Sequence, residues 1–198
     1  MRMRTKIIVL ATGLLLLFGI IGVLRFRQRC LPHFYAVRTG CLYRGGQPRG
    51  LGMEYLAFQK IRTLFSLRGL HADCAKDEAV FATRHNMRFE ADSLGGTPES
   101  VDAAVQRFLA VMDDKANWPV LVHCSRGLER SGVLTAVFRI EYDNWDNDQA
   151  QQEMYRMGLH EGTFPLVEEY IRSYRPRRGG AVVLMEHLRG IPAGTWKD

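Results

Sequence analysis

The sequence predicts an α/β protein with a single, mainly parallel central sheet flanked by helices and preceded by one transmembrane helix. Short apolar runs alternate with stretches whose apolar residues recur at helical spacing, as in repeated strand–helix units. Between residues 119 and 140, an apolar strand, a tight loop and a helix follow one another directly. Near the N-terminus, eighteen residues pass without a charged side chain. We therefore expect an anchor at 1–30, one folded domain at 31–175 and a basic, flexible tail at 176–198.

The distribution of charge argues against a nucleic-acid partner. The chain of 198 residues has a formal net charge of +6, but residues 31–171 contain 15 basic and 19 acidic residues. Residues 1–30 hold six basic residues and no acidic one, and residues 172–198 hold six against two. A mildly acidic body lacks the basic face that binds nucleic acid. Basic residues beside an apolar stretch are typical of a membrane anchor.

The anchor is expected at Ile7–Leu24. As a helix, this run of eighteen residues would be about 27 Å long, against a hydrocarbon core of about 30 Å. Arg25-Phe26-Arg27 follows where a signal peptide would carry small residues for cleavage, so a single uncleaved span is predicted rather than a signal peptide or a buried core helix. Three basic residues flank each side of this run, so the charges leave the orientation of the span in the membrane nearly undetermined. The free amino group favours a cytoplasmic N-terminus, with the domain outside the cytoplasm.

Strands and helices are expected to alternate from residue 42 to residue 118. Leu31–Val37 is expected to be a linker, and Leu42–Pro48 a short strand broken by a Gly-Gly turn and proline. The alternating apolar residues of Ile61–Arg68 predict a core strand. The other expected elements are the helices Met53–Lys60 and Asp73–His85, the strand Met87–Glu90, and a helix that begins at Thr97-Pro98 with a capping hydroxyl and proline in its first turn.

The second half of the domain begins with the strand Pro119–Val122, followed by a helix with its apolar residues between Val133 and Ile140. Two further helices are expected at Gln149–Met157 and Phe164–Tyr174. Ligands of parallel sheets bind beyond the carboxyl ends of the strands, where Cys124 falls.

The loop between this strand and helix has the features of an anion site with a nucleophile. Backbone N–H groups gathered at a helix N-terminus hold an anion, and the same field favours the thiolate form of a cysteine. Arg130, six residues after Cys124, can reach back and bind two phosphate oxygens. The alternative is a buried structural cysteine beside a helix cap.

The run H-C-x5-R-S at residues 123–131, with Gly127 inside it, resembles the active-site loop of the cysteine-based protein tyrosine phosphatases. The compact dual-specificity branch is the most similar. L-Y-R-x-x-Q-P at 42–48 and I-R-T-L-F-S-L-R at 61–68 are similar to stretches of that family as well. A rhodanese-type sulfurtransferase also has a cysteine in an anion-binding loop, but His123 and the Arg130-Ser131 pair are less like that family.

The resemblance implies the fold of that family and a phosphomonoester hydrolase that works through a phosphocysteine, without metal or cofactor. Cys124 would be the nucleophile, His123 would orient the loop and tune the thiol, and Ser131 would assist the departure of sulfur. The alternative for His123 is a strand-end histidine without a catalytic role. The phosphate-binding residues would be Ser125, Arg126, Gly127, Leu128, Glu129 and Arg130.

Asp92 is the candidate general acid. It follows a predicted strand in a glycine-rich loop, and in the resembling family an aspartate at about this separation protonates the leaving oxygen. Glu99 and Asp102 are rivals on a helix, where acids are more naturally solvated. The alternative for Asp92 is a carboxylate that caps a turn.

The expected substrate is a phosphorylated protein, with phosphotyrosine or phosphoserine/threonine. The charges of Arg126 and Glu129 cancel at the rim of the loop. A carboxylate at the rim repels additional phosphate groups and so disfavours multiply phosphorylated substrates. A singly phosphorylated lipid or inositol head group near the anchor is one alternative, and a catalytically dead phosphate-binding module is another. The four cysteines are too scattered for a disulfide framework or a zinc site, although Cys30 and Cys41 would be able to pair in an oxidising compartment.

Overall fold

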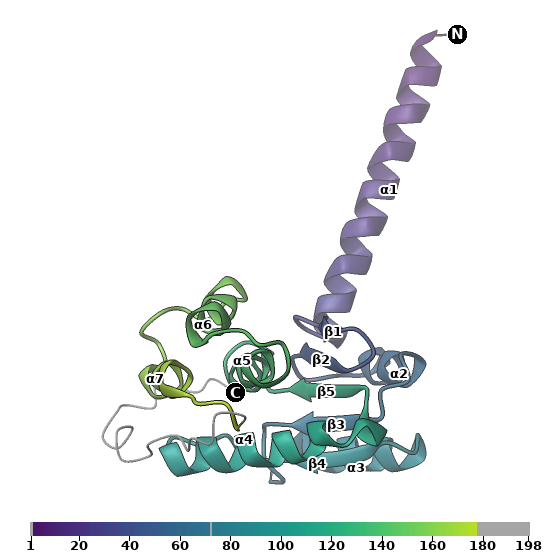
Figure 1. Ribbon diagram of the computed structural model, residues 1–198. Helices are drawn as coiled ribbons and strands as arrows, with labels where there is room; N and C mark the ends of the chain where they lie inside the picture. The colour runs from purple at the N-terminus through teal and green to yellow at the C-terminus, as the bar shows by residue number, and fades with distance from the viewer. Residues whose placement is uncertain (1, 72, 178–198) are drawn as a thin grey trace.

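The computed structural model describes residues 2–71 and 73–177, except for the side chains of residues 2–8 and 11. At its centre lies a five-stranded sheet in the order β1-β2-β5-β3-β4 (Figure 1). β2, β5, β3 and β4 run parallel, and β1 pairs antiparallel with β2 at one edge. The expected α/β class with a mainly parallel sheet is confirmed. The strands are β1 (Tyr35–Arg38), β2 (Leu42–Gly45), β3 (Thr63–Ser66), β4 (Arg88–Ala91) and β5 (Val120–His123).

β1 corrects the expectation of a linker over Leu31–Val37. It is a strand of four residues with a register shift between Ala36 and Arg38, and only Val37 among its residues is buried. So short a segment at a sheet edge has no room to show a hydrophobic period, and its pairing with β2 defines it as a strand. It makes the sheet mixed rather than purely parallel.

Helices cover both faces of the sheet, and β5 shows how the faces divide. Val120 and Val122 belong to the core that α4, α5, α6 and α7 cover, whereas Leu121 belongs to the core under α2 and α3. This alternation is the two-residue period of a strand buried on both faces. The helices are α1 (Arg2–Cys30), α2 (Leu51–Phe58), α3 (Asp73–Arg84), α4 (Pro98–Asp113), α5 (Arg130–Tyr142), α6 (Asn147–Arg156) and α7 (Pro165–Ser173), with a 3-10 turn η1 at Lys115–Asn117.

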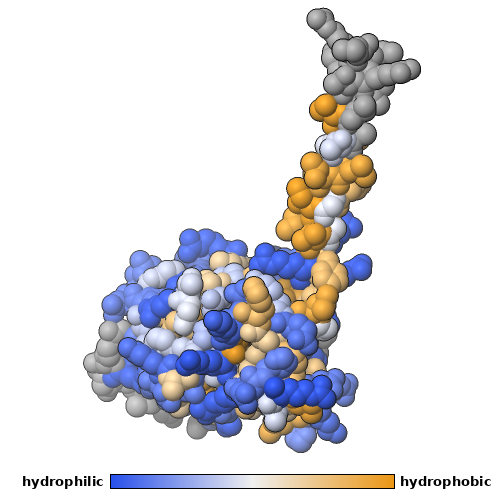
Figure 2. Space-filling view, turned by 90° about the vertical axis from the view of Figure 1, so that its right-hand side faces the viewer, coloured by the Kyte–Doolittle hydropathy of each residue, from blue (hydrophilic) through white to orange (hydrophobic). Residues whose placement is uncertain are grey.

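α1 projects away from the domain as one helix of 29 residues (Figure 1). Its described side chains between Val9 and Leu24 are exposed, and most are apolar (Figure 2). Within the described part of the chain, no helix has both the length and the apolar character needed to cross a membrane. Residues 7, 8 and 11 of the predicted anchor lie outside the described side chains.

The end of α1 is fixed to the domain by close backbone contacts. The carbonyl of Cys30 accepts a hydrogen bond from the N–H of Arg49 at 2.8 Å. A Cβ at Gly52, in the first turn of α2, would lie 2.1 Å from that same carbonyl oxygen. Glycine at position 52 therefore lets the two helices meet.

The described chain ends on the surface of the domain. Arg177, within the predicted tail, places Nη1 2.7 Å from Asp113 and Nε 3.3 Å from Glu141. The rest of the predicted flexible tail at 176–198, from residue 178 on, lies outside the described residues. Cys30, Cys41, Cys74 and Cys124 are all unpaired.

Candidate active site

The loop at the end of β5 surrounds the sulfur of Cys124 with donors. Cys124 is the first residue after the strand and is buried. The N–H of Gly127 donates to its Sγ at 3.2 Å, and the Oγ of Ser131 lies 3.7 Å from the sulfur. Residues 124–129 thus curl around the sulfur before α5 begins at Arg130. A thiolate in this position is stabilised by a backbone donor, a hydroxyl and the positive end of a helix.

Two glycine contacts allow the loop to lie against β2. Gly127 has a φ of +80°, and a Cβ there would lie 2.4 Å from the backbone of Gly45 and Gly46. A Cβ at Gly46 would lie 2.8 Å from the carbonyl oxygen of Arg126. The Gly-Gly turn of the sequence therefore serves close packing against the loop that follows Cys124.

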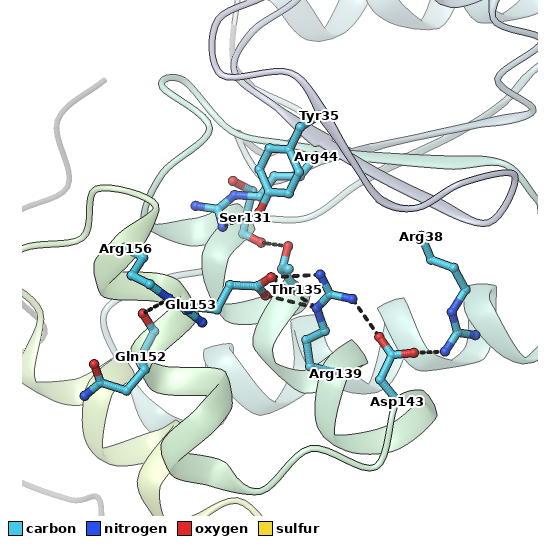
Figure 3. A network of polar contacts seen from close by, with 10 residues as sticks. All are labelled: Tyr35, Arg38, Arg44, Ser131, Thr135, Arg139, Asp143, Gln152, Glu153 and Arg156. Carbon is cyan, nitrogen blue, oxygen red and sulfur yellow. Dashed lines mark hydrogen bonds and ion pairs between the residues drawn. The ribbon is translucent and has the colours of Figure 1, made fainter.

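Arg44 of β2 forms hydrogen bonds to the backbone of this loop. Its side chain is fully buried, with Nε donating to the carbonyl of Gly127 at 2.9 Å and Nη2 donating to that of Leu128. Nη1 donates to the hydroxyl of Tyr35 at 3.2 Å, and Figure 3 shows Arg44, Tyr35 and Ser131 close together. Because these two carbonyls are bonded to a cation, they would repel less an anion bound by the loop N–H groups.

Sequence reasoning missed this role of Arg44. Residue type alone favours a solvated charge at this position, because arginine is rarely fully buried. The available signal was the stretch L-Y-R-x-x-Q-P, in which the arginine precedes the turn that touches the loop.

The charged residues of the loop and of the first turn of α5 make contacts with their surroundings. Arg130 starts α5 and places Nη1 3.4 Å from the carbonyl of Leu67, at the end of β3. Arg126 and Glu129 form an ion pair with each other, so their charges cancel as the sequence predicted. The Nδ1 of His33, from the segment after α1, lies 2.8 Å from the carbonyl oxygen of Arg126.

His123, the last residue of β5, is fully buried. Its Nε2 lies 3.4 Å from a carboxylate oxygen of Glu78, on α3. Burial lowers the pKa of the imidazole, and the Glu78 carboxylate opposes that shift. Sequence reasoning did not single out Glu78, because nothing in the order of residues links α3 to the end of β5.

Asp92 follows β4 and lies on the same edge of the sheet as Cys124, with β3 between their strands. Adjacent strands are about 4.8 Å apart, so the two strand ends are separated by about 10 Å. The Oδ2 of Asp92 lies 2.9 Å from the Nε of Arg107, on α4. Both residues border a hollow of about 350 Å³ with Arg68 and His71. Asp102, a rival acid, accepts a hydrogen bond from the Tyr170 hydroxyl at 3.0 Å.

Comparison with models of protein families shows to which family the chain belongs. The family model described as "Tyrosine phosphatase family" matches residues 31–177. The chain belongs to the tyrosine phosphatase family. The matched range contains every predicted site residue and leaves α1 outside it.

Two curated proteins are similar to this tyrosine phosphatase family member. One is the putative tyrosine-protein phosphatase OCA1 of Yarrowia lipolytica, 25% identical over 142 residues, which are 69% of this chain and 55% of the relative. The other is the dual specificity protein phosphatase TpbA of Pseudomonas aeruginosa, 45% identical over 41 residues, 21% of this chain and 19% of that protein. The chain thus spans about half the length of the first relative and a fifth of the second.

Solved structures share the fold. The core catalytic domain of the PP-IP phosphatase SIW14 from S. cerevisiae superposes with a TM-score of 0.62 at 19% identity, covering 80% of this chain and 95% of that one. P. aeruginosa TpbA superposes with a TM-score of 0.57 at 24% identity, covering 79% and 88%. At these identities the likeness of this family member to both structures concerns the fold.

Proposed function

We propose that the protein is a metal-independent cysteine phosphatase that hydrolyses phosphomonoesters through a phosphocysteine intermediate. The observation that carries this proposal is the surroundings of the Cys124 sulfur, with the Gly127 N–H at 3.2 Å and the Ser131 hydroxyl at 3.7 Å. Membership of the tyrosine phosphatase family supports it, as do the names of its relatives. The cysteine is unpaired and is therefore available as a nucleophile.

In the first step, the Cys124 thiolate attacks phosphorus in line and the bond to the leaving oxygen breaks. Asp92 gives its proton to that oxygen. In the second step, water attacks phosphorus, the sulfur–phosphorus bond breaks, and Asp92 takes a proton from the water. Arg130 and the loop N–H groups bind the equatorial oxygens throughout, while Ser131 donates to the departing sulfur. His123 supports the loop from the α3 side.

The activity test compares two buried cysteines. Cys124→Ser should abolish hydrolysis of p-nitrophenyl phosphate while vanadate still binds, and Cys41→Ser, in the core away from the loop, should retain turnover. Wild-type activity should survive EDTA and be lost on alkylation of the thiol. Complete loss in EDTA would contradict the metal-free scheme. Absence of turnover with retained vanadate binding would favour a catalytically dead phosphate-binding module.

For the substrate, we propose a shallow site that accepts phosphotyrosine, with phosphoserine and phosphothreonine, in proteins. The support is the Arg126–Glu129 ion pair, which leaves the loop rim without the extra positive charge that a polyphosphorylated ligand would need. The proposed substrate class differs from the one in the name of the PP-IP phosphatase among the structural neighbours. A singly phosphorylated lipid head group near α1 is the second candidate.

The substrate test measures kcat/KM at one ionic strength for phosphotyrosine peptides, inositol polyphosphates and a phosphatidyl monophosphate. Peptides should be hydrolysed fastest. An inositol polyphosphate that is turned over faster than every peptide would show that the rim-charge argument is wrong.

We further propose that α1 holds the domain at a membrane as a single-pass anchor, with the catalytic domain outside the cytoplasm. The eighteen uncharged residues from Ile7 to Leu24 support this. So does an outward apolar stripe on α2, the helix that touches the end of α1, formed by Leu51, Tyr55 and Phe58. Tyrosine and phenylalanine suit the membrane–water interface.

A further inference from the structure

The segment that follows α1 reaches the loop around Cys124 through one exposed side chain, that of His33. The Nδ1 of His33 lies 2.8 Å from the carbonyl oxygen of Arg126. Because a carbonyl oxygen only accepts hydrogen bonds, Nδ1 carries a hydrogen and donates it to this oxygen. The reaction described above gives this contact no role.

The carbonyl that His33 binds belongs to the same peptide unit as the N–H that faces the sulfur. The N–H of Gly127 donates to Cys124 Sγ at 3.2 Å. The peptide bond between Arg126 and Gly127 is trans, and a trans peptide unit is planar, so its C=O and its N–H point in opposite directions. A donor that fixes the Arg126 oxygen on one side therefore fixes the direction of the Gly127 N–H on the other.

The neighbouring carbonyls of the loop are bonded by other donors. The carbonyl of Ser125 accepts from the backbone N–H of Gln47 at 3.0 Å, and the side chain of Arg44 donates to the carbonyls of residues 127 and 128. The carbonyl between them, that of residue 126, is bonded by His33. His33 thus completes a row of donors along residues 125–128.

The backbone around His33 is held from both sides. Its φ is +48°, in the left-handed region, which residues other than glycine adopt where their surroundings impose it. Its N–H donates at 3.1 Å to Oε1 of Gln28, near the end of α1. The carbonyl of Pro32 accepts from the N–H of Gly46 at 2.6 Å. A side chain on a backbone held in this way loses little further freedom when it donates.

We propose that His33 is a positioning residue for the Cys124 site. Through the peptide unit between Arg126 and Gly127, its Nδ1–H directs the Gly127 N–H at the sulfur. A phosphoryl group bonded to that sulfur lies beside the same N–H, which stabilises its negative charge. The segment after α1 is thereby part of the active site. This inference rests on the proposed role of Cys124 as nucleophile.

The test compares His33→Gly with His33→Asn in the full chain. Glycine and asparagine both tolerate a positive φ, and the amide nitrogen of asparagine is as many bonds from Cβ as Nδ1 of histidine. In His33→Gly, vanadate binding and kcat/KM for p-nitrophenyl phosphate should each weaken about fivefold, the order of one lost hydrogen bond. His33→Asn should stay near the wild-type values, because it keeps the donor.

Asn86→Gly is the matched control for the glycine substitution. Asn86 is likewise exposed and has a φ of +53°, but it precedes β4, at the opposite end of the sheet from Cys124. This variant should leave vanadate binding and kcat/KM unchanged. Equal losses in His33→Gly and His33→Asn, or no loss in His33→Gly, would overturn the proposal.

Wild-type protein provides a second measurement that does not depend on the folding of a variant. The ring ¹⁵N shifts of His33 should show a hydrogen on Nδ1, since only that form donates to the Arg126 carbonyl. An Nδ1 without a hydrogen would overturn the proposal.

The peptide unit itself can be observed in the two variants. Arginine labelled with ¹³C at its carbonyl and glycine labelled with ¹⁵N select the Arg-Gly peptides, among them Arg126-Gly127. The Gly127 N–H shift should differ between His33→Gly and His33→Asn, which both lack the imidazole ring, and identical shifts would contradict the positioning role. Vanadate binding and these shifts need no turnover. Failure to hydrolyse any aryl phosphate would therefore count against the proposed function, whereas unmoved shifts would count against His33.

Discussion

A single buried arginine, Arg44, forms two hydrogen bonds to the backbone of the loop after β5. Arg44 bonds the carbonyls of Gly127 and Leu128 and turns the peptide groups of the loop in one direction. Hydrogen bonds from a charged donor contribute about 1.5–3 kcal/mol each. Arg44 therefore both stabilises the domain and fixes the backbone of this loop.

We predict that Arg44→Lys weakens phosphate binding and turnover together. Lysine keeps the charge but loses the planar fork that bonds two carbonyls at once. The free energy of unfolding should fall by about 3 kcal/mol, and kcat/KM for p-nitrophenyl phosphate should fall at least tenfold. Arg49→Lys, at an exposed position five residues along, is the control and should change neither value. If the kcat/KM of Arg44→Lys equals that of the wild type, the planar guanidinium of Arg44 does not orient the loop.

The acid role of Asp92 is a second prediction at the scale of one residue. Asp92→Asn should reduce turnover by roughly 10²–10⁴, because the leaving oxygen loses its proton donor. The loss should be smallest for aryl phosphates with good leaving groups. The control is Asp102→Asn, because the carboxylate of Asp102 accepts a hydrogen bond from the Tyr170 hydroxyl. An equal loss for good and poor leaving groups would assign Asp92 a structural role in its pair with Arg107.

Between elements, one arginine joins the helix of the phosphate loop to its neighbours. Arg139 of α5 contacts Glu153 of α6 at 2.8 Å and Asp143 at 2.8 Å, and Arg38 of β1 pairs with the other oxygen of Asp143 (Figure 3). This chain of ion pairs runs from the sheet edge to α6. It holds α5 in place behind the loop.

We predict that Arg139→Met lowers the free energy of unfolding by about 3 kcal/mol, because it leaves Glu153 buried without its partner. Arg172→Met breaks an exposed pair with Glu169 and should cost less than about 1 kcal/mol. Urea unfolding of both variants provides the comparison. Equal losses would mean that the Arg139 network is no stronger than a surface pair.

At the scale of the whole molecule, a helix of 29 residues that contains the uncharged run Ile7–Leu24 is joined to a mildly acidic domain. Hydrogen bonds from Arg49 to Cys30 and from Gly46 to Pro32 fix the exit of α1 close to β2 and to the phosphate-binding loop. A membrane-held α1 would therefore keep the active site near the membrane surface.

We predict that the full chain stays in the membrane fraction through high-salt and alkaline washing, with Met1 or Arg2 at its N-terminus. Leu16→Arg, within the uncharged run, should release a large part of the protein, because an arginine at the centre of a span costs about 2.5–3.5 kcal/mol. Gln28→Arg, beyond the run, should remain in the membrane. Release of wild-type protein by salt alone would indicate a peripheral association.

The sequence by itself determined the class of the fold and the position of the loop that holds the candidate nucleophile. Both are local: strand, loop and helix follow one another around Cys124, and apolar periods mark each element within a window of some ten residues. The capping hydroxyl of Thr97 and the helix beginning at Pro98 were predictable for the same reason.

The tertiary structure alone decided which distant residues serve that loop. Arg44 lies 83 residues before Gly127, and Glu78 lies 45 before His123. They meet because the sheet places β2 and β3 on either side of β5, while α3 covers one face. The strand β1 and the pairing of Asp92 with Arg107 depend on the same order of strands and helices. Contacts across a sheet leave no period in the chain, because they depend on strand order and register rather than on neighbours in sequence.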